Sequence, residues 1–276
     1  MAQPRILVDH SLSAGVRIAL DEAQSRHVGT VLRLAPGDVL RVFNAREGEW
    51  RARIADKSKR GMNVTVEERL RPARATPDLD LLFAPVKRHA TDLTVEKATE
   101  LGVRRLRPVI TQRTIAETVR LERLQAIARE AAEQTERFDA PEILPPLALA
   151  KALDGWDEAR PLIYADEAGE ATPLIEALSQ TFSLAEKVAA KRPDEGRSDT
   201  QTSERLNTPH PLPPSRGGAL ALLIGPEGGF TPEERRMLRA LPFVVPVSLG
   251  PRILRAETAV IAALSVIQAT WGDWRG

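Results

Sequence analysis

Residues 222–234 read LLIGPEGGFTPEE, a short apolar run followed by a glycine-rich turn and the start of a helix. Glycines fill three of the five turn positions, and glycine adopts backbone angles that other residues resist. The TPEE that follows has a capping threonine, a proline at the first helical position and a glutamate for a capping box. The stretch therefore predicts a buried strand, a turn that allows close approach of a ligand, and a helix.

The sequence around this stretch alternates between apolar strand patterns and helical patterns. Between the strand candidates, apolar residues recur at spacings of three and four, as in LERLQAIAREAAEQ and ETAVIAALSVIQATW. The strand candidates are LDLLFAPV (79–86), RRLRPVIT (104–111), RPLIYADE (160–167), GALALLIG (218–225) and FVVPVSLG (243–250). This alternation predicts an α/β domain over residues 73–276 with a largely parallel sheet.

Residues 1–72 have a different pattern, with short alternating strands separated by turn signals such as APGD and NAREGE. We expect a small β-barrel with one short helix near 22–32, and a domain junction at RPARATPD, residues 71–78. Residues 1–74 carry 14 Lys or Arg against nine Asp or Glu, which gives +5, and the rest of the chain therefore carries −4 of the net +1. A basic N-terminal module indicates a polyanion partner, although chance scatter of surface charge is the alternative.

The segment at about 185–218 fits neither domain. It is polar, rich in proline and poor in apolar residues, so it buries too little surface to offset the entropy of ordering it. We expect a disordered insertion, with a functional lid as the alternative.

Three predicted strands end in polar or glycine-rich turns: YADEAGE (164–170), IGPEGGF (224–230) and SLGPRILRAET (248–258). Ligands of parallel α/β sheets bind beyond the carboxyl ends of the strands, so these turns are expected to line one pocket. GPEGGFT lacks the lysine of a phosphate-binding loop and is not a dinucleotide fingerprint. Glu227 in the turn favours a cationic, donor-rich ligand, and S-adenosylmethionine is such a molecule.

Several motifs together resemble the ribosomal RNA small-subunit methyltransferase E family, which belongs to the SPOUT superfamily and methylates N3 of a uridine. They are RHVGTVLRLAPGD (26–38), ELGV (100–103), AAEQTER (131–137), GPEGGFTPEE (225–234) and LGPRILRAETA (249–259). The resemblance covers nearly the whole chain. It implies a PUA-like RNA-binding barrel, a SPOUT α/β domain with a C-terminal trefoil knot, and a homodimer that forms through the helix at 257–271.

The resemblance also implies where S-adenosyl-L-methionine and RNA bind. The candidate cofactor-binding residues are Ala165, Asp166, Ile224, Gly225, Glu227, Gly229, Leu249, Gly250, Pro251, Ile253 and Leu254. The candidate RNA contacts are Arg5, Arg26, His27, Arg33, Lys87 and Arg88; arginine suits phosphate recognition because its guanidinium is planar and rich in donors. The expected substrate is small-subunit ribosomal RNA or the assembled subunit.

Two candidate catalytic residues follow the third turn. Arg255 is expected to steady a developing uridine anion, with phosphate positioning or a dimer contact as alternatives. Glu257 begins a helix, where it either interacts favourably with the helix dipole or accepts a proton.

Two other functions remain open from the sequence alone. One is a knotted methyltransferase acting on another RNA or base, and the other is a non-catalytic RNA-binding ribosome-assembly protein. The four histidines lack metal-ligand spacing, so no metal is expected. The absence of cysteine, of a long apolar stretch and of a secretory signal suggests a cytoplasmic protein without a membrane partner.

Overall fold

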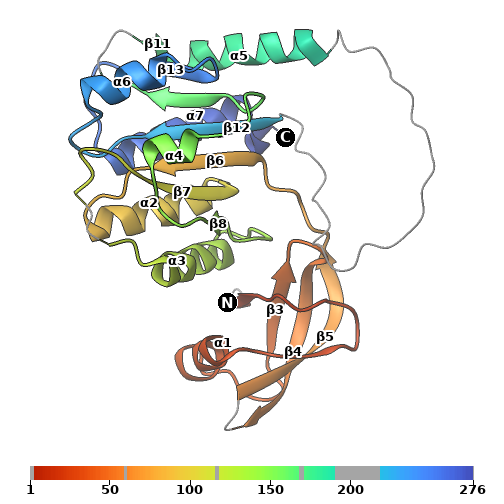
Figure 1. Cartoon of the computed structure of the whole chain (residues 1–276). Helices are drawn as coiled ribbons and strands as arrows, with labels where there is room; N and C mark the ends of the chain where they lie inside the picture. Colours follow the sequence, from red (N-terminus) through yellow and green to blue (C-terminus); the bar gives the residue numbers. More distant parts are fainter. Residues whose placement is uncertain (1–2, 59–60, 116–117, 168–170, 190–217, 276) are drawn as a thin grey trace.

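The computed structural model describes residues 3–58, 61–115, 118–167, 171–189 and 218–275. For residues 182–189 it describes the backbone alone. Two sheets form two bodies that follow one another along the chain, with the larger α/β part above the N-terminal sheet in Figure 1. Most of the expected insertion, residues 190–217, lies outside the described residues. The expected start of the insertion, at about 185, is too early, because helix α5 continues to Ala189.

The N-terminal sheet has five strands in the order β1-β3-β4-β5-β2. Only the β1–β3 pair is parallel, and the other three pairs are antiparallel. The elements are β1 (Arg5–Leu7), β2 (Arg17–Ala19), α1 (Glu22–Arg26), the π-helical turn η1 (His27–Val31), β3 (Val39–Asn44), β4 (Gly48–Ser58) and β5 (Gly61–Arg71).

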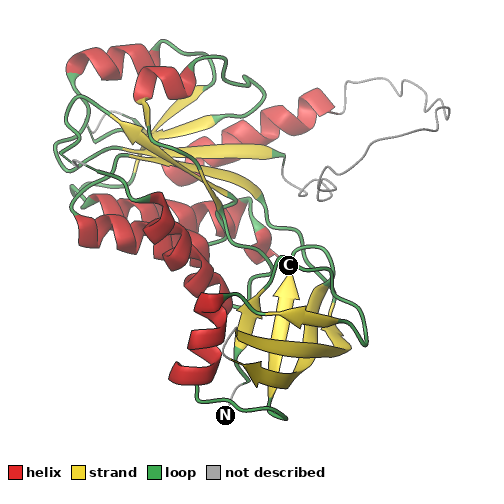
Figure 2. Cartoon of the chain, turned by 60° about the horizontal axis from the view of Figure 1, so that its bottom comes forward, coloured by secondary structure: helices red, strands yellow, loops and turns green. Residues whose placement is uncertain are grey.

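Alternate residues of the N-terminal strands point into one apolar core, as the period-two pattern predicts. On β5, Met62, Val64 and Val66 are buried against Leu40 and Val42 of β3. Figure 2 shows the strands curling around this core. The predicted helix at 22–32 is present, but it splits into α1 and η1, and a capping box at Asp21 starts it.

The larger sheet follows the order β11-β13-β10-β12-β6-β7-β8, with β9 paired to β7. Every strand pair in it is parallel. The strands are β6 (Asp78–Phe83), β7 (Arg105–Ile110), β8 (Glu142–Ile143), β9 (Leu147–Ala148), β10 (Leu162–Ala165), β11 (Thr172–Pro173), β12 (Ala219–Ile224) and β13 (Val244–Ser248). All five predicted strands are confirmed.

Helices cover both faces of this sheet (Figure 2), so its central strands are apolar on both sides. On β12, Leu222 and Ile224 face the layer of α2, α3, α5 and α7, while Leu223 faces the layer of α4 and α6. The helices are α2 (Arg88–Glu100), α3 (Leu121–Gln134), α4 (Leu149–Leu153), α5 (Leu174–Ala189), α6 (Pro232–Arg239), α7 (Ala256–Thr270) and the 3₁₀ turn η2 (Asp273–Arg275). None of the described helices has the length and apolar character needed to cross a membrane.

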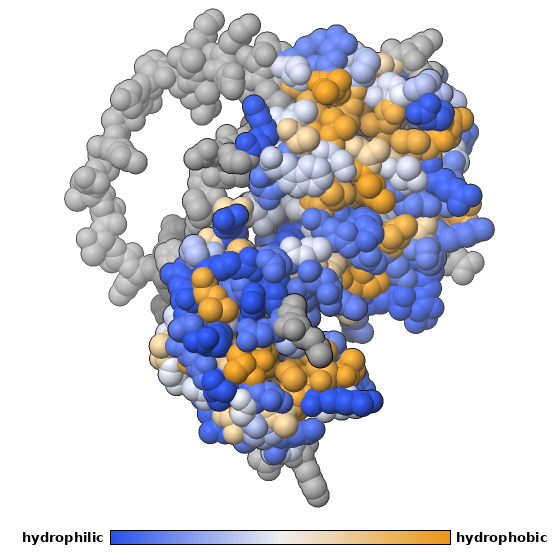
Figure 3. All heavy atoms as spheres, turned by 180° about the vertical axis from the view of Figure 1, so that it is seen from behind, coloured by the Kyte–Doolittle hydropathy of each residue, from blue (hydrophilic) through white to orange (hydrophobic). Residues whose placement is uncertain are grey.

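Charged residues also occupy the interior of the α/β part. Asp80 on β6 has no exposed surface, and its two carboxylate oxygens accept hydrogen bonds of 2.7 Å from Nε of Arg105 and Nε of Arg107 on β7. At the surface, hydrophilic residues surround smaller apolar patches, as the rear view in Figure 3 shows. Asp80 and its arginines therefore link β6 to β7 inside the α/β part.

Candidate active site

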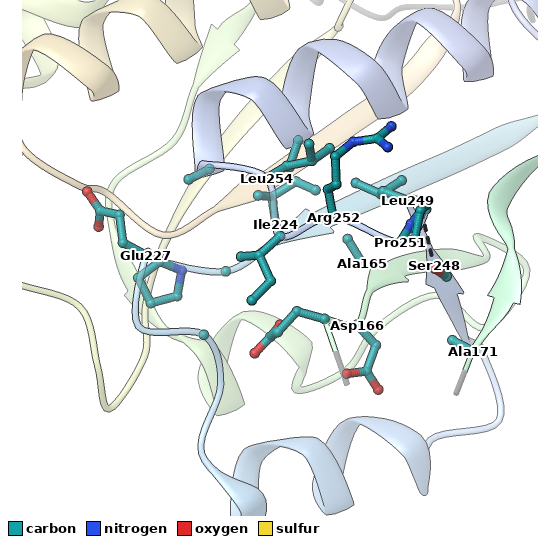
Figure 4. Close-up of a pocket in the computed structure, with 18 of the residues that line it drawn as sticks. Ala165, Asp166, Ala171, Ile224, Glu227, Ser248, Leu249, Pro251, Arg252 and Leu254 are labelled. Carbon is teal, nitrogen blue, oxygen red and sulfur yellow. Dashed lines mark hydrogen bonds between the residues drawn. The ribbon is translucent and has the colours of Figure 1, made fainter. Parts of the chain in front are cut away.

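The three predicted turns converge on one cavity of about 480 Å³ at the carboxyl ends of β10, β12 and β13. Figure 4 shows side chains from all three turns around this space. The lining includes each of the eleven residues that the sequence suggested for cofactor binding. β10 lies between β12 and β13, and both pairs are parallel. The three strands therefore end at the same edge of the sheet, where their turns meet.

The first turn brings two carboxylates to the cavity. Asp166 is 3% exposed, and its Oδ2 accepts hydrogen bonds from Nε and Nη2 of Arg239 at 3.0 and 2.6 Å. Glu167 forms an ion pair with Arg235. Both arginines belong to α6, so this helix fixes the acidic side of the cavity.

A tyrosine is buried next to this turn. Tyr164 on β10 has no exposed surface, and its hydroxyl has no hydrogen-bond partner within the described part of the chain. Burial raises the pKa of Tyr164, and the charges of Asp166 and Glu167 raise it further. The phenol therefore stays protonated throughout the physiological pH range.

The helix that follows the second turn starts as the sequence predicts. Thr231 and Glu234 form the expected capping box at the start of α6, with Pro232 at the first helical position. A β carbon at Gly225 would lie 2.6 Å from the ring of Phe230, so only glycine fits there. Phe230 in turn packs edge-on against Tyr164, with the ring centroids 5.2 Å apart. The close approach at Gly225 is thus to the protein's own aromatic ring.

The third turn carries the apolar wall of the cavity. Leu249 and Leu254 pack against the core of the α/β part. Gly250 has a φ of +108°, a region that disfavours other residues, and its N–H donates to Oγ of Ser248 at 3.2 Å, the dashed line in Figure 4. Ile253, next to Leu254, is 89% exposed.

The two candidate catalytic residues do not line the cavity. Arg255 is exposed and precedes α7 as its N-cap residue without a side-chain cap, and Glu257 is half-buried in the first turn of α7. Arg252 lines the cavity instead and is labelled in Figure 4. The lining also includes Glu167, Pro226, Ser248 and Ala256, which lie within the three predicted turns, and Ala171, Pro173 and Ala259, which sequence reasoning missed. Ala259 is three positions after Ala256 on one helix face, which is a signal that could have found it.

Five of the six candidate RNA contacts are exposed. Arg26, His27 and Arg33 lie on or just after the α1–η1 segment, and Lys87 and Arg88 lie at the start of α2. Their positions leave them accessible to a large ligand.

Arg5 is the exception, because it is buried and bonded within the protein, and its prediction as an RNA contact is wrong. Its side chain is 6% exposed, and its Nε donates to Glu49 at 2.8 Å. Its remaining nitrogens donate to the carbonyls of Ala132, Glu133 and Arg137 at the end of α3, at 3.0–3.3 Å. The cation satisfies carbonyls at a helix C-terminus, where a positive charge is stabilising. Arg5 therefore docks the N-terminal sheet onto the α/β part.

No group of three or more His, Asp or Glu side chains able to hold a metal occurs among the described residues. Two of the three acidic residues that line the cavity, Asp166 and Glu167, pair with arginines of α6. The site therefore presents carboxylates, backbone groups and apolar side chains to a ligand.

Comparisons with known proteins agree with this architecture. A family model of the RNA methyltransferase domain matches residues 74–268, and one of the RNA methyltransferase PUA domain matches residues 20–67. The ribosomal RNA small subunit methyltransferase E of Rickettsia conorii is 30% identical over 97% of this chain and 96% of that protein. The corresponding protein of Synechocystis is 29% identical over 91% of this chain and 73% of its own length.

Solved structures are similar over nearly the full length. A putative methyltransferase of Legionella pneumophila, in complex with SAM, has a TM-score of 0.76 and 28% identity over 99% of this chain and 100% of that one. The ribosomal RNA small subunit methyltransferase E of Neisseria gonorrhoeae, bound to S-adenosyl methionine, has a TM-score of 0.75 with the same identity and coverage. The two family models thus place a PUA domain before an RNA methyltransferase domain along the chain. The chain belongs to the RNA methyltransferase family.

Proposed function

We propose that this protein transfers a methyl group from S-adenosyl-L-methionine to N3 of a uridine in small-subunit ribosomal RNA. The observation that carries the proposal is the convergence of three separate turns on one cavity. The choice of substrate is supported by relatives that are named as small-subunit ribosomal RNA methyltransferases and are similar to this chain over almost its whole length. The PUA domain match supports an RNA ligand for the N-terminal part.

The cavity fits this cofactor in size and chemistry. Its volume of about 480 Å³ is within the usual range of roughly 300–1,000 Å³ for small-molecule sites. Leu249 and Leu254 offer an apolar surface for adenine, and the backbone of Gly225, Leu249 and Gly250 offers donors and acceptors for its edge. Glu227 supplies negative charge for an amino group or a sulfonium, whereas the charge of Glu167 is compensated by Arg235. When bound, the cofactor supplies an electrophilic methyl group.

The protein's own contribution is alignment and charge stabilisation. The turns hold the donor so that the attacking nitrogen can approach in line, and alignment of this kind supplies several kcal/mol of the barrier. Uridine N3 carries a proton at neutral pH, so that proton must leave as the N–C bond forms. We assign stabilisation of the developing anion to Arg255, beside the cavity, and leave Glu257 as either a helix-capping carboxylate or the proton acceptor.

A homodimer is part of the proposal. Ile253 lines the cavity and is 89% exposed, so a partner packed there would remove a large apolar side chain from water. Thr258, Ala262, Ser265 and Ala269 of α7 lie on the less buried side of that helix. A partner packed on α7 would cover both features.

A trefoil knot at the C-terminal end is also proposed. β12 lies between β10 and β6, and the chain then crosses to β13 on the other side of β10. Afterwards α7 returns to pack against the layer that holds α2 and α5. A crossing of this kind fits a threaded chain, which is a rare exception among protein folds.

The decisive experiment is methylation of purified small ribosomal subunits, and of naked small-subunit RNA, with isotopically labelled cofactor. Digestion to nucleosides should yield labelled N3-methyluridine. A different methylated nucleoside would favour the related activity on another base or RNA. Calorimetry that detects no cofactor binding would favour a non-catalytic ribosome-assembly role. Because the proposed substrate is ribosomal RNA, we also expect the protein in the cytoplasm, which fractionation of cells would test.

A further inference from the structure

A second cavity, of about 420 Å³, lies at the same edge of the large sheet as the first. The start of α2, the loop that follows β7 and the start of α3 enclose it. No candidate cofactor-binding residue lines it, so it is separate from the cavity of the three turns. The following argument about its ligand rests on the proposed function.

The lining of this second cavity is strongly basic. It contains Lys87, Arg88, Arg120 and Arg123 against a single carboxylate, Asp92, so four positive charges and one negative charge leave +3. Arg123 and Asp92 pair with each other, with Nη2–Oδ2 at 2.6 Å and Nε–Oδ1 at 3.0 Å. The other three cations are exposed and make no ion pair with any described residue. Three charges therefore remain for a ligand.

Two helix starts add to this positive potential. Lys87 is the N-cap residue of α2 and Arg120 that of α3, and neither start has a side-chain cap. The first turn of α2 contains no acidic residue, while that of α3 contains only Glu122. Free N–H groups and the helix dipole favour an anion at such positions. The positive side chains and the two helix N-termini thus both favour an anion.

Hydrogen bonds connect the loops around the second cavity to the turn and helix beside the methyl-donor cavity. The N–H of Ala84, at the end of β6, donates to the carbonyl of Ile224 at 3.1 Å. In the loop after β7, Nη1 of Arg113 donates to the carbonyl of Gly228 at 2.7 Å, and the N–H of Gln112 donates to Glu234 at 2.8 Å. Both loops that frame the basic cavity are therefore bonded to the glycine turn of the donor cavity or to the helix that follows it.

We infer that the basic cavity binds a backbone phosphate of the substrate RNA close to the nucleotide that is methylated. Planar guanidinium groups and an ammonium suit phosphate oxygens. A phosphate held here would fix the RNA strand relative to the glycine turn, because the loops after β6 and β7 are hydrogen-bonded to Ile224, Gly228 and Glu234. Lys87, Arg88 and Arg120 are then substrate-positioning residues.

The test uses the full chain with Lys87→Gln, Arg88→Gln and Arg120→Gln combined. Binding of small-subunit RNA without cofactor is measured by fluorescence anisotropy over a range of salt concentrations. We expect RNA affinity to fall at least about tenfold, and the salt slope to flatten by about 0.7 for each phosphate that the variant no longer binds. KM for RNA should rise more than kcat falls, and calorimetry should give an unchanged affinity for S-adenosylmethionine.

Lys151→Gln is the matched control, because this exposed lysine lies on α4, on the opposite face of the sheet. Unchanged RNA affinity and salt slope in the triple variant would overturn the inference, and so would an equal loss in the control. If the triple variant does not fold, the three single variants carry the test, each with about a threefold loss of RNA affinity expected. Failure of the wild-type protein to methylate would refute the proposed function, whereas the RNA-binding measurement judges the basic cavity alone.

Discussion

The clearest test of the cavity is the change of Gly225 to alanine. A β carbon there would lie 2.6, 3.0 and 3.1 Å from three ring carbons of Phe230. Since unstrained carbon contacts lie at about 3.5–4.0 Å, the ring or the turn must move by about 1 Å. Phe230 is 1% exposed and packed against Tyr164, so the ring cannot yield easily. The turn must therefore move.

Overpacking of this kind costs about 1–3 kcal/mol. If that cost falls on the turn geometry needed for binding, the dissociation constant for S-adenosylmethionine rises about 5- to 150-fold. Calorimetry measures the affinity, and urea unfolding followed by circular dichroism measures the stability. Adding Phe230→Leu to the alanine variant should recover part of the affinity, because the shorter side chain leaves room for the new methyl group.

Gly228 provides a control in the same turn. A β carbon there would lie 3.5 Å from Cδ of Arg113, which is an ordinary contact. Gly228→Ala should therefore bind cofactor within about twofold of the wild-type protein. Equal affinities for Gly225→Ala and the wild-type protein would refute the argument that the ring fixes this turn.

Three further predictions concern charged residues. Asp80→Asn should destabilise the protein by about 3–5 kcal/mol in urea unfolding, because Arg105, Arg107 and Arg160 lose a buried charged partner; a loss below about 1 kcal/mol would contradict this. Although burial opposes it, hydrogen bonds and charge from Arg71 and Arg5 lower the pKa of Glu49 below its usual 4.5. The carboxylate therefore stabilises the fold above pH 4.5 and loses this effect as the pH falls through the lowered pKa, so Glu49→Gln should unfold at lower urea at pH 7 and approach wild type at low pH. An equal deficit at every pH would refute that linkage. Arg255→Gln should lower kcat about 10²–10³-fold with little change in cofactor affinity, whereas Arg236→Gln on α6 should leave kcat unchanged; a normal kcat for Arg255→Gln would move the role to Arg252.

Local patterns predict the elements that carry the donor cavity. The capping box at Thr231 and the apolar run of β12 depend on residues within a few positions, so the sequence alone is sufficient to find them. The convergence of the three turns follows from a general property of parallel sheets. Strand order, which decides which turns meet, has no local signal in the sequence and is given by the structure.

Contacts between distant parts of the chain are not predictable in this way. Arg5 resembles a surface cation in the sequence, but its partner Glu49 is 44 positions away, and the carbonyls that it caps are 127 to 132 positions away. The sequence suggests a ligand-facing role for Gly225, whereas the ring that requires glycine there belongs to Phe230 of the same turn. Arg252 lies between two predicted cavity residues, but nothing in its residue type indicates which way the turn directs its side chain.

The dependence of β1 on α3 has a consequence for how the protein is made. Ribosomes add roughly 5–20 residues each second, so Arg5 leaves the ribosome many seconds before the carbonyls that it caps have been synthesised. Until then, Glu49 is the only one of these hydrogen-bond partners of Arg5 that has been synthesised, because the carbonyls belong to Ala132, Glu133 and Arg137. Docking of the N-terminal sheet onto the α/β part therefore requires α3 and the residues just after it, and the first strand completes its bonding well after its own translation.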